Sequence, residues 1–529
     1  MNRYIFITGG VLSSLGKGIT SASLGALLEG MGYKISFLKL DPYINIDPGT
    51  MSTYQHGEVF VTDDGTETDL DLGHYERFTH AIMSKRNNAT AGKLYAQLLD
   101  KERQGAFLGG TVQVVPHFTN EIKDQIRQSA EGADITLVEI GGTVGDIESE
   151  PFLEAIRQMG LEQNQKCLYI HVTYVPRILT QELKTKPTQH SVKELRAVGI
   201  QPNIIIGRSE VPLPEDIKKK IALFTNVDPQ AVFSDPDFSS IYEAPLYFAQ
   251  EKLHETVARY FDMPVKRLHV QHWIDFMQSL NNQEHKVRMA IVGKYTELHD
   301  AYLSLHEALI HAQAATKTYA AIEWIDSELL TDATIEEQLK GVNGILIPGG
   351  FGERGVEGKI RAVRYAREHN IPYFGICLGM QIAVIEFARN VLNLSKANST
   401  EFNKETPYPV VTLMADQQTV SAKGATMRLG AYPCHIIKPS KAYELYGKQE
   451  ISERHRHRYE FNPEFVSQFA KAGFEVTGEF EARHLPEIIE LKNHPYFIAC
   501  QFHPEFKSKP GQPHPLFVGF MQAMNKYRR

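Results

Sequence analysis

The sequence predicts an α/β protein of two domains, each with a mainly parallel sheet flanked by helices. Short apolar segments alternate with longer helical segments up to about residue 260, and the alternation starts again at Met289 after a polar stretch. Strands that alternate with helices form βαβ units and hence parallel sheets. The chain of 529 residues is also long enough for more than one hydrophobic core.

The first domain is predicted over residues 1–266, a linker over residues 267–286 and the second domain over residues 287–529. Strands of the first domain are expected at residues 4–8, 35–40, 135–140, 168–172 and 204–206, and strands of the second at residues 289–293, 344–348, 372–376 and 496–502. The linker is polar and turn-prone. Residues 41–78 show little periodicity, and we expect a long functional loop there.

Composition excludes several classes of protein. The formal net charge of -7 lacks the basic excess of a nucleic-acid binder. The four cysteines are too widely spaced for a disulfide framework or a CxxC zinc site, which indicates a reducing compartment. No apolar run approaches the ~18 residues that span a bilayer, and the N-terminus lacks the pattern of a signal peptide. We therefore expect a cytoplasmic protein that binds neither nucleic acid nor membrane.

A glycine-rich loop follows the first predicted strand and runs from Gly9 into a helical stretch. Its glycines let backbone N–H groups face a phosphate, the helix N-terminus adds a positive dipole, and Lys17 can reach the outer phosphates. The spacing is not the usual GxxxxGK[ST], because five residues separate Gly10 from Gly16, and Gly18 stands where the magnesium-binding hydroxyl would be. The layout predicts a P-loop-like nucleotide site.

Magnesium at such a site needs carboxylates from elsewhere. Asp71 lies in an acidic segment, where the sequence alone leaves Asp69 as an alternative ligand, and Glu139 ends a predicted strand. Hard cations take oxygen ligands, and ligands gather at strand ends of open α/β sheets. Taken singly, an acid of this kind is more often a solvated surface group.

In the second half, Cys377 lies between a predicted strand and a predicted helix, flanked by Gly375 and Gly379. This G-x-C-x-G pattern is the cysteine counterpart of the nucleophile elbow. A helix N-terminus stabilises a thiolate, and backbone N–H groups beside the cysteine and from residues 348–352 can hold an oxyanion. The pattern predicts acyl transfer.

A thiolate nucleophile needs a base, and the base needs an orienting group. His503 and Glu505 follow the last predicted strand, with a proline between them. Glutamine suits the resulting Cys–His–Glu set, because attack on its amide carbonyl releases ammonia and leaves a thioester that water hydrolyses.

Seven motifs extend this interpretation: Ser13-Ser-Leu-Gly-Lys-Gly, Lys39-Leu-Asp-Pro-Tyr-Ile-Asn, Gln55-His-Gly-Glu-Val-Phe-Val, Gly141-Gly-Thr-Val-Gly-Asp-Ile-Glu, Lys184-Thr-Lys-Pro-Thr-Gln-His, Gly375-Ile-Cys-Leu-Gly-Met-Gln and Arg454-His-Arg-His-Arg-Tyr-Glu. With them the chain resembles the CTP synthase family over nearly its whole length. The resemblance implies a synthetase domain followed by a class I glutamine amidotransferase domain.

The resemblance also implies site residues. ATP would be held by Ser14, Leu15, Gly16, Lys17, Gly18, Ile19 and Asp71, with Asp71 and Glu139 as magnesium ligands. UTP or CTP would contact Ser13, Asp146, Ile147, Glu148, Lys184, Thr185, Lys186, Pro187, Thr188, Gln189 and Lys220. Cys377, His503 and Glu505 would be catalytic, and glutamine would contact Gly350, Leu378, Gly379, Met380, Gln381, Glu401 and Arg458. Lysines suit a triphosphate, and one acid with one base suits the free end of glutamine.

By the same resemblance, ATP phosphorylates O4 of UTP, and ammonia made from glutamine displaces the phosphate to give CTP. The family implies Mg²⁺ without an organic prosthetic group, activation by GTP, inhibition by CTP, an enclosed ammonia passage, a homotetramer, and filaments. This chain departs from the family in two places. It lacks a lysine near Ser234 beside the adenine site, and residues 415–424 form a shorter stretch than in longer members.

Two other functions fit part of the pattern. Another ATP-dependent amidotransferase would activate a carboxylate of a cofactor precursor, and residues 184–190 argue against it. A non-catalytic assembly protein would not need Lys17, Cys377 and His503. Glutaminase activity separates the scaffold from both enzymes.

Overall fold

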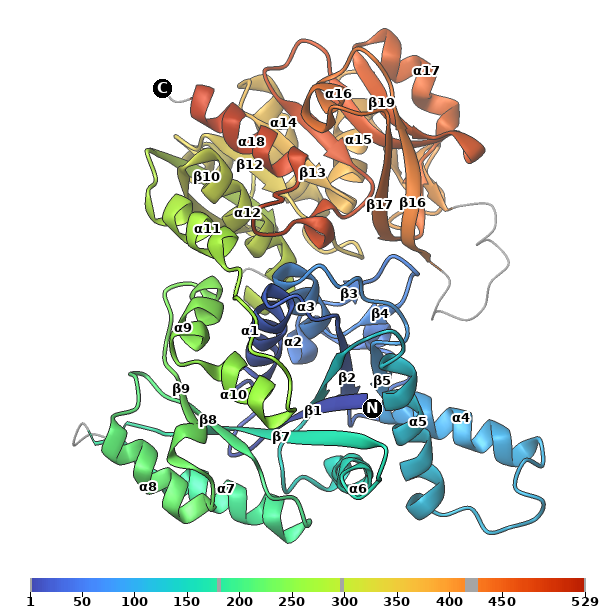
Figure 1. Cartoon of the computed structure of the whole chain (residues 1–529). Coiled ribbons are helices and arrows are strands. Elements are labelled where there is room, and N and C mark those ends of the chain that lie inside the picture. The colour runs from blue at the N-terminus through green and yellow to red at the C-terminus, as the bar shows by residue number, and fades with distance from the viewer. Residues whose placement is uncertain (1, 178–181, 295–298, 414–426, 528–529) are drawn as a thin grey trace. The chain divides into compact units, whose positions relative to one another are not determined.

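The computed structural model describes residues 2–177, 182–294, 299–413 and 427–527, so the short stretch at residues 415–424 lies outside the described residues. The chain divides into two units. Unit 1 comprises residues 1–51 and 68–277, and unit 2 comprises residues 52–67 and 278–529. Figure 1 shows both units, with labels where there is room.

The sheet of unit 1 has seven strands, and all its neighbouring pairs are parallel. Its order is β5 (Asn88–Thr90), β2 (Ile35–Asp41), β6 (Ile135–Ile140), β1 (Asn2–Gly9), β7 (Gln165–Tyr174), β8 (Ile204–Arg208) and β9 (Val232–Asp235). Each strand expected in this part of the chain is present. Successive side chains of β1 point to opposite faces, so Tyr4 and Phe6 enter a core that excludes Ile5.

Helices cover both faces of this sheet. The core that contains Tyr4 is closed by α4 (Ala91–Arg103), α5 (Thr119–Ser129) and α6 (Glu150–Met159). Against α1 (Lys17–Gly30) pack α3 (Asp71–Phe78), α9 (Ala244–Gln250) and α10 (Leu253–Tyr260). A further pair is α7 (Lys186–Ala197) with α8 (Glu215–Thr225), which lie side by side in Figure 1. The prediction of a loop over residues 41–78 is therefore wrong for its last residues, which form α3. There Leu72, Tyr75 and Phe78 form the buried apolar side of the helix.

The main sheet of unit 2 has nine strands, of which the first five in order are mutually parallel. They are β11 (Thr318–Asp326), β10 (His285–Gly293), β12 (Gly344–Ile347), β13 (Tyr373–Ile376) and β21 (Phe497–Cys500). Four antiparallel strands follow: β20 (Leu485–Leu491), β19 (Phe474–Phe480), β16 (Arg428–Ile436) and β17 (Glu450–His457). The parallel part was expected, and the antiparallel extension was not.

Two cores flank the parallel strands of unit 2. Alternate residues of β10 enter them, Met289 and Ile291 on one face and Ala290 and Val292 on the other. One core is closed by α12 (Leu303–Thr316) and α18 (Pro515–Lys526), and the other by α14 (Val356–Glu368) and α15 (Leu378–Asn390). Smaller elements are α13 (Ile335–Leu339), α16 (Lys441–Tyr446), α17 (Pro463–Lys471) and a sheet of β14 (Ala397–Ser399), β15 (Tyr408–Leu413) and β18 (Tyr459–Phe461).

The predicted linker contains a helix where turns were expected. Helix α11 (Gln271–Asn281) buries Trp273, Phe276 and Met277, and the boundary between the units falls after Met277. Residues 52–67 belong to unit 2 although they precede most of unit 1 in the sequence. They contain α2 (Thr53–His56) and β3 (Phe60–Val61), and β3 pairs with β4 (Glu67–Thr68).

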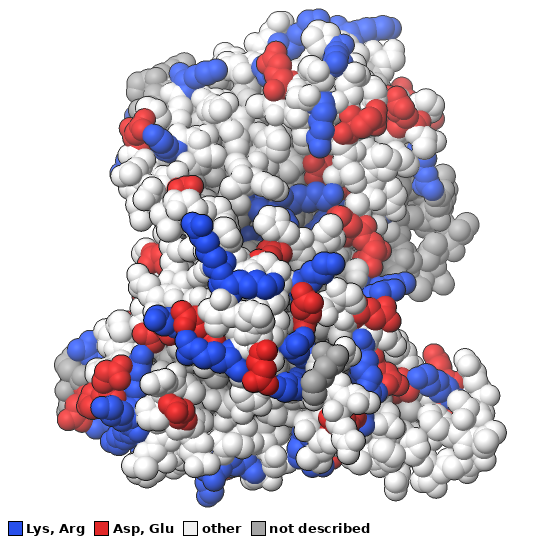
Figure 2. Space-filling view, viewed as in Figure 1, with Lys and Arg blue, Asp and Glu red and all other residues white. Residues whose placement is uncertain are grey.

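The surface carries charges of both signs. Figure 2 shows basic and acidic side chains mixed over the visible face. Among the helices of the described residues, none combines the length and apolar character that crossing a bilayer requires.

Candidate active sites

Cys377 sits on a strained turn between β13 and α15. Its φ of 50° and ψ of -99° lie outside the regions that L-residues ordinarily occupy. A non-glycine residue persists there when its surroundings hold it, and the Cys377 N–H donates to the Cys500 carbonyl at 2.7 Å. Leu378 is the first residue of α15, so its N–H has no acceptor within that helix. The expected nucleophile elbow is present.

Gly379 allows this turn to pack against β12. A Cβ atom at Gly379 would lie 2.3 Å from the backbone oxygen of Ile347. We therefore predict that Gly379→Ala lowers the stability of unit 2 by about 1–3 kcal/mol, because backbone must move to accept the methyl group. Thermal unfolding followed by circular dichroism measures this, and an unchanged Tm would contradict it.

His503 and Glu505 meet beside the elbow, as expected. The Nδ1 atom of His503 lies 2.7 Å from Oε1 of Glu505, and both residues are buried. The Nε2 atom of His503 is buried and makes no hydrogen bond to the described part of the protein. Gly349 lies against the ring, because a Cβ there would be 2.7 Å from Cε1. Glu505 thus orients the imidazole, and Nε2 is left for a reacting group.

Charge keeps this imidazole protonated. Burial lowers the pKa of His503, but the charges of Glu505 and Cys377 and the Glu505 hydrogen bond outweigh burial and raise the pKa to about 10. An imidazolium beside a sulfur favours the thiolate that attacks an amide.

The raised pKa has a measurable consequence for stability. The unfolded histidine has a pKa of about 6.5, so its stabilising contribution is complete below about pH 6.5 and is lost as pH rises toward 10. We predict that the Tm falls between about pH 7 and pH 10 and that His503→Gln makes this fall shallower. Calorimetry over that range measures both proteins, and parallel curves would contradict the prediction.

Glu401 and Arg458 lie close enough to interact, as a site for the free end of glutamine requires. Burial raises the pKa of Glu401, while the Gly352 N–H and the charges of Lys294 and Arg458 oppose the rise. Gly352 N donates to Glu401 Oε1 at 2.8 Å, which fixes the carboxylate beside the glycine-rich loop. Gly350 faces Leu378, since its Cβ would be 3.4 Å from Leu378 Cδ2.

Two other predicted glutamine contacts have different surroundings. Met380 is fully buried in the core beneath α15. The Gln381 Nε2 donates to the Tyr459 carbonyl at 2.9 Å, and the side chain is 3% exposed.

In unit 1, Asp71 and Glu139 converge on the ammonium of Lys39. Lys39 Nζ contacts Asp71, lies 3.1 Å from Glu139 and lies 3.7 Å from Asp41. Tyr75 also donates to Glu139, at 2.5 Å. Burial lowers the pKa of Lys39, but the neighbouring carboxylates raise it well above the usual value. The positive charge of Lys39 does not offset all the carboxylates around it. The pKa of Glu139 is accordingly raised, by burial and by the negative charge of Asp71.

The glycine-rich loop brings the predicted phosphate contacts next to this cluster. Gly16, at φ 88°, precedes α1, and Lys17 Nζ donates to the Gly142 carbonyl at 2.8 Å. A Cβ at Gly18 would lie 2.1 Å from Asp71 Oδ1, so glycine is required there by the carboxylate. Burial lowers the pKa of Lys17, a shift that the charge of Glu139 opposes. The remaining predicted ATP contacts, Ser14, Leu15 and Ile19, lie on the same loop and the first turn of α1.

These carboxylates fit magnesium. Among the described residues no three His, Cys, Asp or Glu side chains form a complete metal cluster. Mg²⁺ usually takes one or two carboxylates and completes its shell with water and substrate phosphates. Asp71 and Glu139 provide two convergent carboxylates beside a phosphate loop, with more negative charge than Lys39 neutralises.

The predicted pyrimidine nucleotide contacts are distributed over three segments of unit 1. Residues 184–189 lead into α7, Lys220 lies on α8, and residues 146–148 follow β6. Hydrogen bonding and charge from Lys184, with a smaller effect of Lys220, lower the pKa of Glu182, so the two lysines lie on one surface. Ser13 is exposed on the glycine-rich loop.

Sequence reasoning assigned no role to Lys39 or Asp41, and it named Asp69 only as the alternative to Asp71 as a magnesium ligand. Burial raises the pKa of Asp69 well above its usual value, and the charges of Asp71 and Asp41 add to the rise, although Lys39 opposes it. The sequence did contain a signal for Lys39 and Asp41. They stand two positions apart near the end of a strand, so both side chains point to the same face of the sheet.

Residues 52–67 supply two acids that hold β17 beside His503. Asp63 accepts from Arg454 at 2.6 Å, and Glu67 accepts from Arg456 at 2.8 Å. The Arg454 carbonyl accepts from the His503 N–H at 2.7 Å. This segment therefore positions the strand to which the histidine is bonded.

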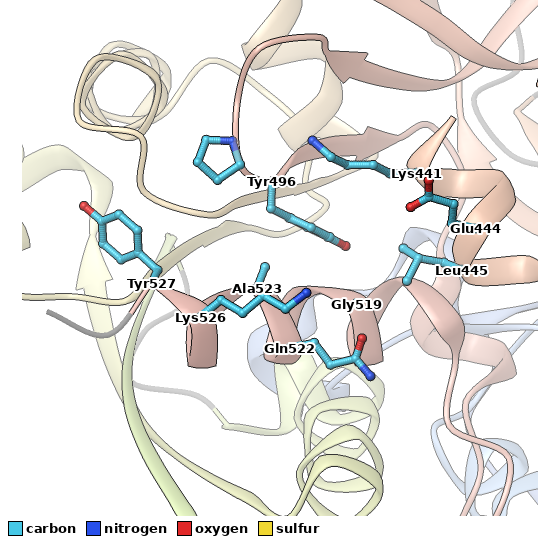
Figure 3. A pocket seen from close by; sticks show the side chains of 10 residues that line it. Lys441, Glu444, Leu445, Tyr496, Gly519, Gln522, Ala523, Lys526 and Tyr527 are labelled. Atoms are coloured by element: carbon cyan, nitrogen blue, oxygen red, sulfur yellow. The ribbon is translucent and has the colours of Figure 1, made fainter. Parts of the chain in front are cut away.

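Unit 2 also has a cavity of about 370 Å³ (Figure 3). Its lining residues are Lys441, Glu444, Leu445, Pro495, Tyr496, Gly519, Gln522, Ala523, Lys526 and Tyr527, and none of them is a predicted glutamine contact.

Comparison with known proteins identifies both halves of the chain. Residues 3–263 match the family model "CTP synthase N-terminus", and residues 297–523 match "Glutamine amidotransferase class-I". A protein of Caldanaerobacter subterraneus named CTP synthase is 56% identical over 99% of this chain and 98% of its own length. One of Hydrogenobaculum with the same name is 57% identical over 100% of this chain and 98% of its own length.

A solved structure of the glutaminase domain of Trypanosoma brucei CTPS with bound acivicin is also similar. It is 42% identical, covers 45% of this chain and 94% of its own chain, and aligns with a TM-score of 0.43.

Proposed function

The chain belongs to the CTP synthase family, and from that premise we propose that it aminates UTP to CTP with ATP and with ammonia that unit 2 releases from glutamine. The observation that carries the proposal is the strained Cys377 elbow with an oriented, protonated His503 beside it. The full-length identity to relatives named CTP synthase supports the substrates.

In unit 2, the Cys377 sulfur attacks the side-chain carbonyl carbon of glutamine. The carbonyl π electrons move to oxygen, where the N–H groups of Leu378 and Gly350 are available to the oxyanion. The C–N bond then breaks, His503 delivers a proton to the leaving nitrogen, and ammonia departs. Water, deprotonated by His503, hydrolyses the thioester to glutamate and restores the thiol.

In unit 1, we propose that the loop from Ser13 to Ile19 holds the ATP phosphates and that Lys17 offsets their charge. Asp71 and Glu139 would hold Mg²⁺, which neutralises phosphate charge when bound. The lysines of residues 184–189 and Lys220 would bind the triphosphate of UTP. Transfer of the γ-phosphoryl group to the uracil O4 makes a leaving group, and ammonia displaces it as phosphate at C4.

Ammonia must avoid protonation, since ammonium has no free lone pair. We therefore propose an enclosed passage from the site of glutamine hydrolysis to the site of synthesis. Activation by GTP, inhibition by CTP and assembly into a homotetramer or filaments are proposed on family membership.

One assay tests the proposed function. Purified protein is given UTP, ATP and Mg²⁺ with either glutamine plus GTP or ammonium chloride, and CTP is followed by its absorbance. We expect product with both nitrogen donors. No product with either donor, from protein that still hydrolyses glutamine, would overturn the assignment of UTP and favour an amidotransferase with a different acceptor.

A further inference from the structure

Besides His503, the sulfur of Cys377 has two polar neighbours, the Arg456 carbonyl at 4.0 Å and the side chain of Gln501. Nε2 of Gln501 lies 3.6 Å from Sγ of Cys377, and the Gln501 side chain is fully buried. Backbone bonds hold the two residues together: the Cys377 N–H donates to the Cys500 carbonyl at 2.7 Å, and the Gln501 N–H donates to the Glu487 carbonyl at 2.9 Å. The amide therefore contacts the sulfur from a rigid part of the sheet.

Which end of the amide faces the sulfur follows from its other partners. The Tyr459 carbonyl can only accept, so Gln381 must turn its NH₂ group toward it, at 2.9 Å. The same NH₂ group lies 3.4 Å from Gln501 Oε1, which accepts its other hydrogen. Gln501 is thereby left with its own NH₂ group facing Cys377.

Two histidines fix the far end of this hydrogen-bonded chain. The Tyr459 carbonyl also accepts from His457 Nδ1 at 3.2 Å, so Nε2 of a neutral His457 accepts from His455 Nδ1 at 2.8 Å. Burial first, and then the charge of Arg428, lowers the pKa of both histidines well below the usual value. Both rings are therefore neutral with one tautomer each, and the Tyr459 carbonyl accepts from His457 as well as from Gln381.

We propose that Gln501 is a catalytic residue of glutamine hydrolysis, whose amide N–H donates to the Cys377 sulfur and favours the thiolate, and that Gln381 is the positioning residue that orients it. The inference rests on the proposed function. It assigns Gln381 a role through Gln501, which differs from direct contact with substrate. The attack, the proton transfer and the leaving group stay as described above.

The size of the effect follows from thiol chemistry. A hydrogen bond to the charged form of a group favours that form. A hydrogen bond that raises the fraction of thiolate about tenfold also lowers the nucleophilicity of each thiolate roughly threefold, because the Brønsted coefficient for thiolates is about 0.4–0.5. The direct gain from one donor is therefore roughly threefold in rate, and loss of orientation adds to the defect when the donor is removed.

The test uses Gln501→Met, which keeps the length of the side chain and removes the donor, and Gln501→Glu, which places an acceptor there. Gln313→Met is the matched control, because Gln313 is a buried glutamine of α12 in the same unit that accepts from the Ala320 N–H. The pH profile of Cys377 alkylation by iodoacetamide is measured by mass spectrometry. Burial raises the pKa of Cys167, Cys434 and Cys500, so those thiols react slowly.

We expect Gln501→Met to move the midpoint of alkylation up by about one pH unit and to lower glutamine-dependent kcat/KM about threefold to tenfold. Gln501→Glu should move the midpoint further, Gln381→Met should move it less, and Gln313→Met should leave it in place. Ammonia-driven synthesis should be unchanged in all of them.

An unchanged alkylation profile in Gln501→Met would overturn the proposal. If that variant does not fold, the Gln501→Glu profile decides in the same way. Because alkylation needs no glutamine, a shifted profile in protein that does not hydrolyse glutamine would refute the proposed function and leave the Gln501 contact standing.

Discussion

Replacing Cys377 with alanine is expected to abolish CTP synthesis from glutamine, with a loss of about 10⁴-fold or more, and to leave synthesis from ammonia unchanged within about twofold. Removing the nucleophile of an acyl-transfer site costs this much because binding and the oxyanion hole alone give little turnover. The cysteine is 2% exposed, so its loss leaves a small cavity and a folded unit 2. CTP formation with each nitrogen donor measures the two activities.

Cys434→Ala is the matched control, because Cys434 is a buried cysteine of unit 2 on β16. It should retain synthesis with both donors. Continued use of glutamine by Cys377→Ala would exclude this thiol as the nucleophile, and loss of the ammonia reaction would show that the substitution acts beyond glutamine hydrolysis.

The arrangement of Cys377, His503 and Glu505 was predictable from sequence because each of its parts is local. A strand, a cysteine between glycines and a helix form within residues 373–390, and His503 and Glu505 are two residues apart. Parallel strands carry residues at their carboxyl ends to one edge of the sheet. Neighbouring β13 and β21 therefore bring Cys377 and His503 together without further information.

Other features depend on long-range contacts that leave no periodic signal. Lys39 gains its importance from Asp71 and Glu139, which lie 32 and 100 residues away. Residues 52–67 join unit 2 through side chains such as Asp63, which pairs with Arg454 across 391 positions. The donor at Gln501 is identified by the orientation of Gln381, which follows from the Tyr459 carbonyl.

The antiparallel strands and α11 were missed for a different reason. Antiparallel strands such as β19 mix buried with half-buried residues and lack the fully buried run of β6 or β21. Helix α11 was missed although Trp273, Phe276, Met277 and Leu280 recur at helical spacing, because the residues that follow, 281–286, are polar and turn-prone. In the structure Trp273 packs against Phe78 and Tyr242 with ring centroids 5.3 and 6.0 Å apart.

Replacing Asp71 with asparagine is expected to reduce synthesis from both glutamine and ammonia by on the order of 10²-fold or more, because a neutral amide is a poor magnesium ligand. The substitution keeps the shape of the side chain against Gly18 and removes the charge next to Lys39. The rate of synthesis from ammonia is measured against Mg²⁺ concentration, and hydrolysis of glutamine to glutamate serves as the control for an intact unit 2.

Asp69→Asn is the matched substitution. It tests whether Asp69 binds the metal ion or only shapes the turn that leads into Asp71. Asp69 Oδ1 accepts from the Asp71 N–H at 3.2 Å, and an amide oxygen can replace it in that bond. We expect the Mg²⁺ dependence of Asp69→Asn to stay within about threefold of the parent protein. If Asp69→Asn shifted the Mg²⁺ dependence while Asp71→Asn did not, the metal ligand would be Asp69, and the contact of Asp71 with Lys39 would be structural.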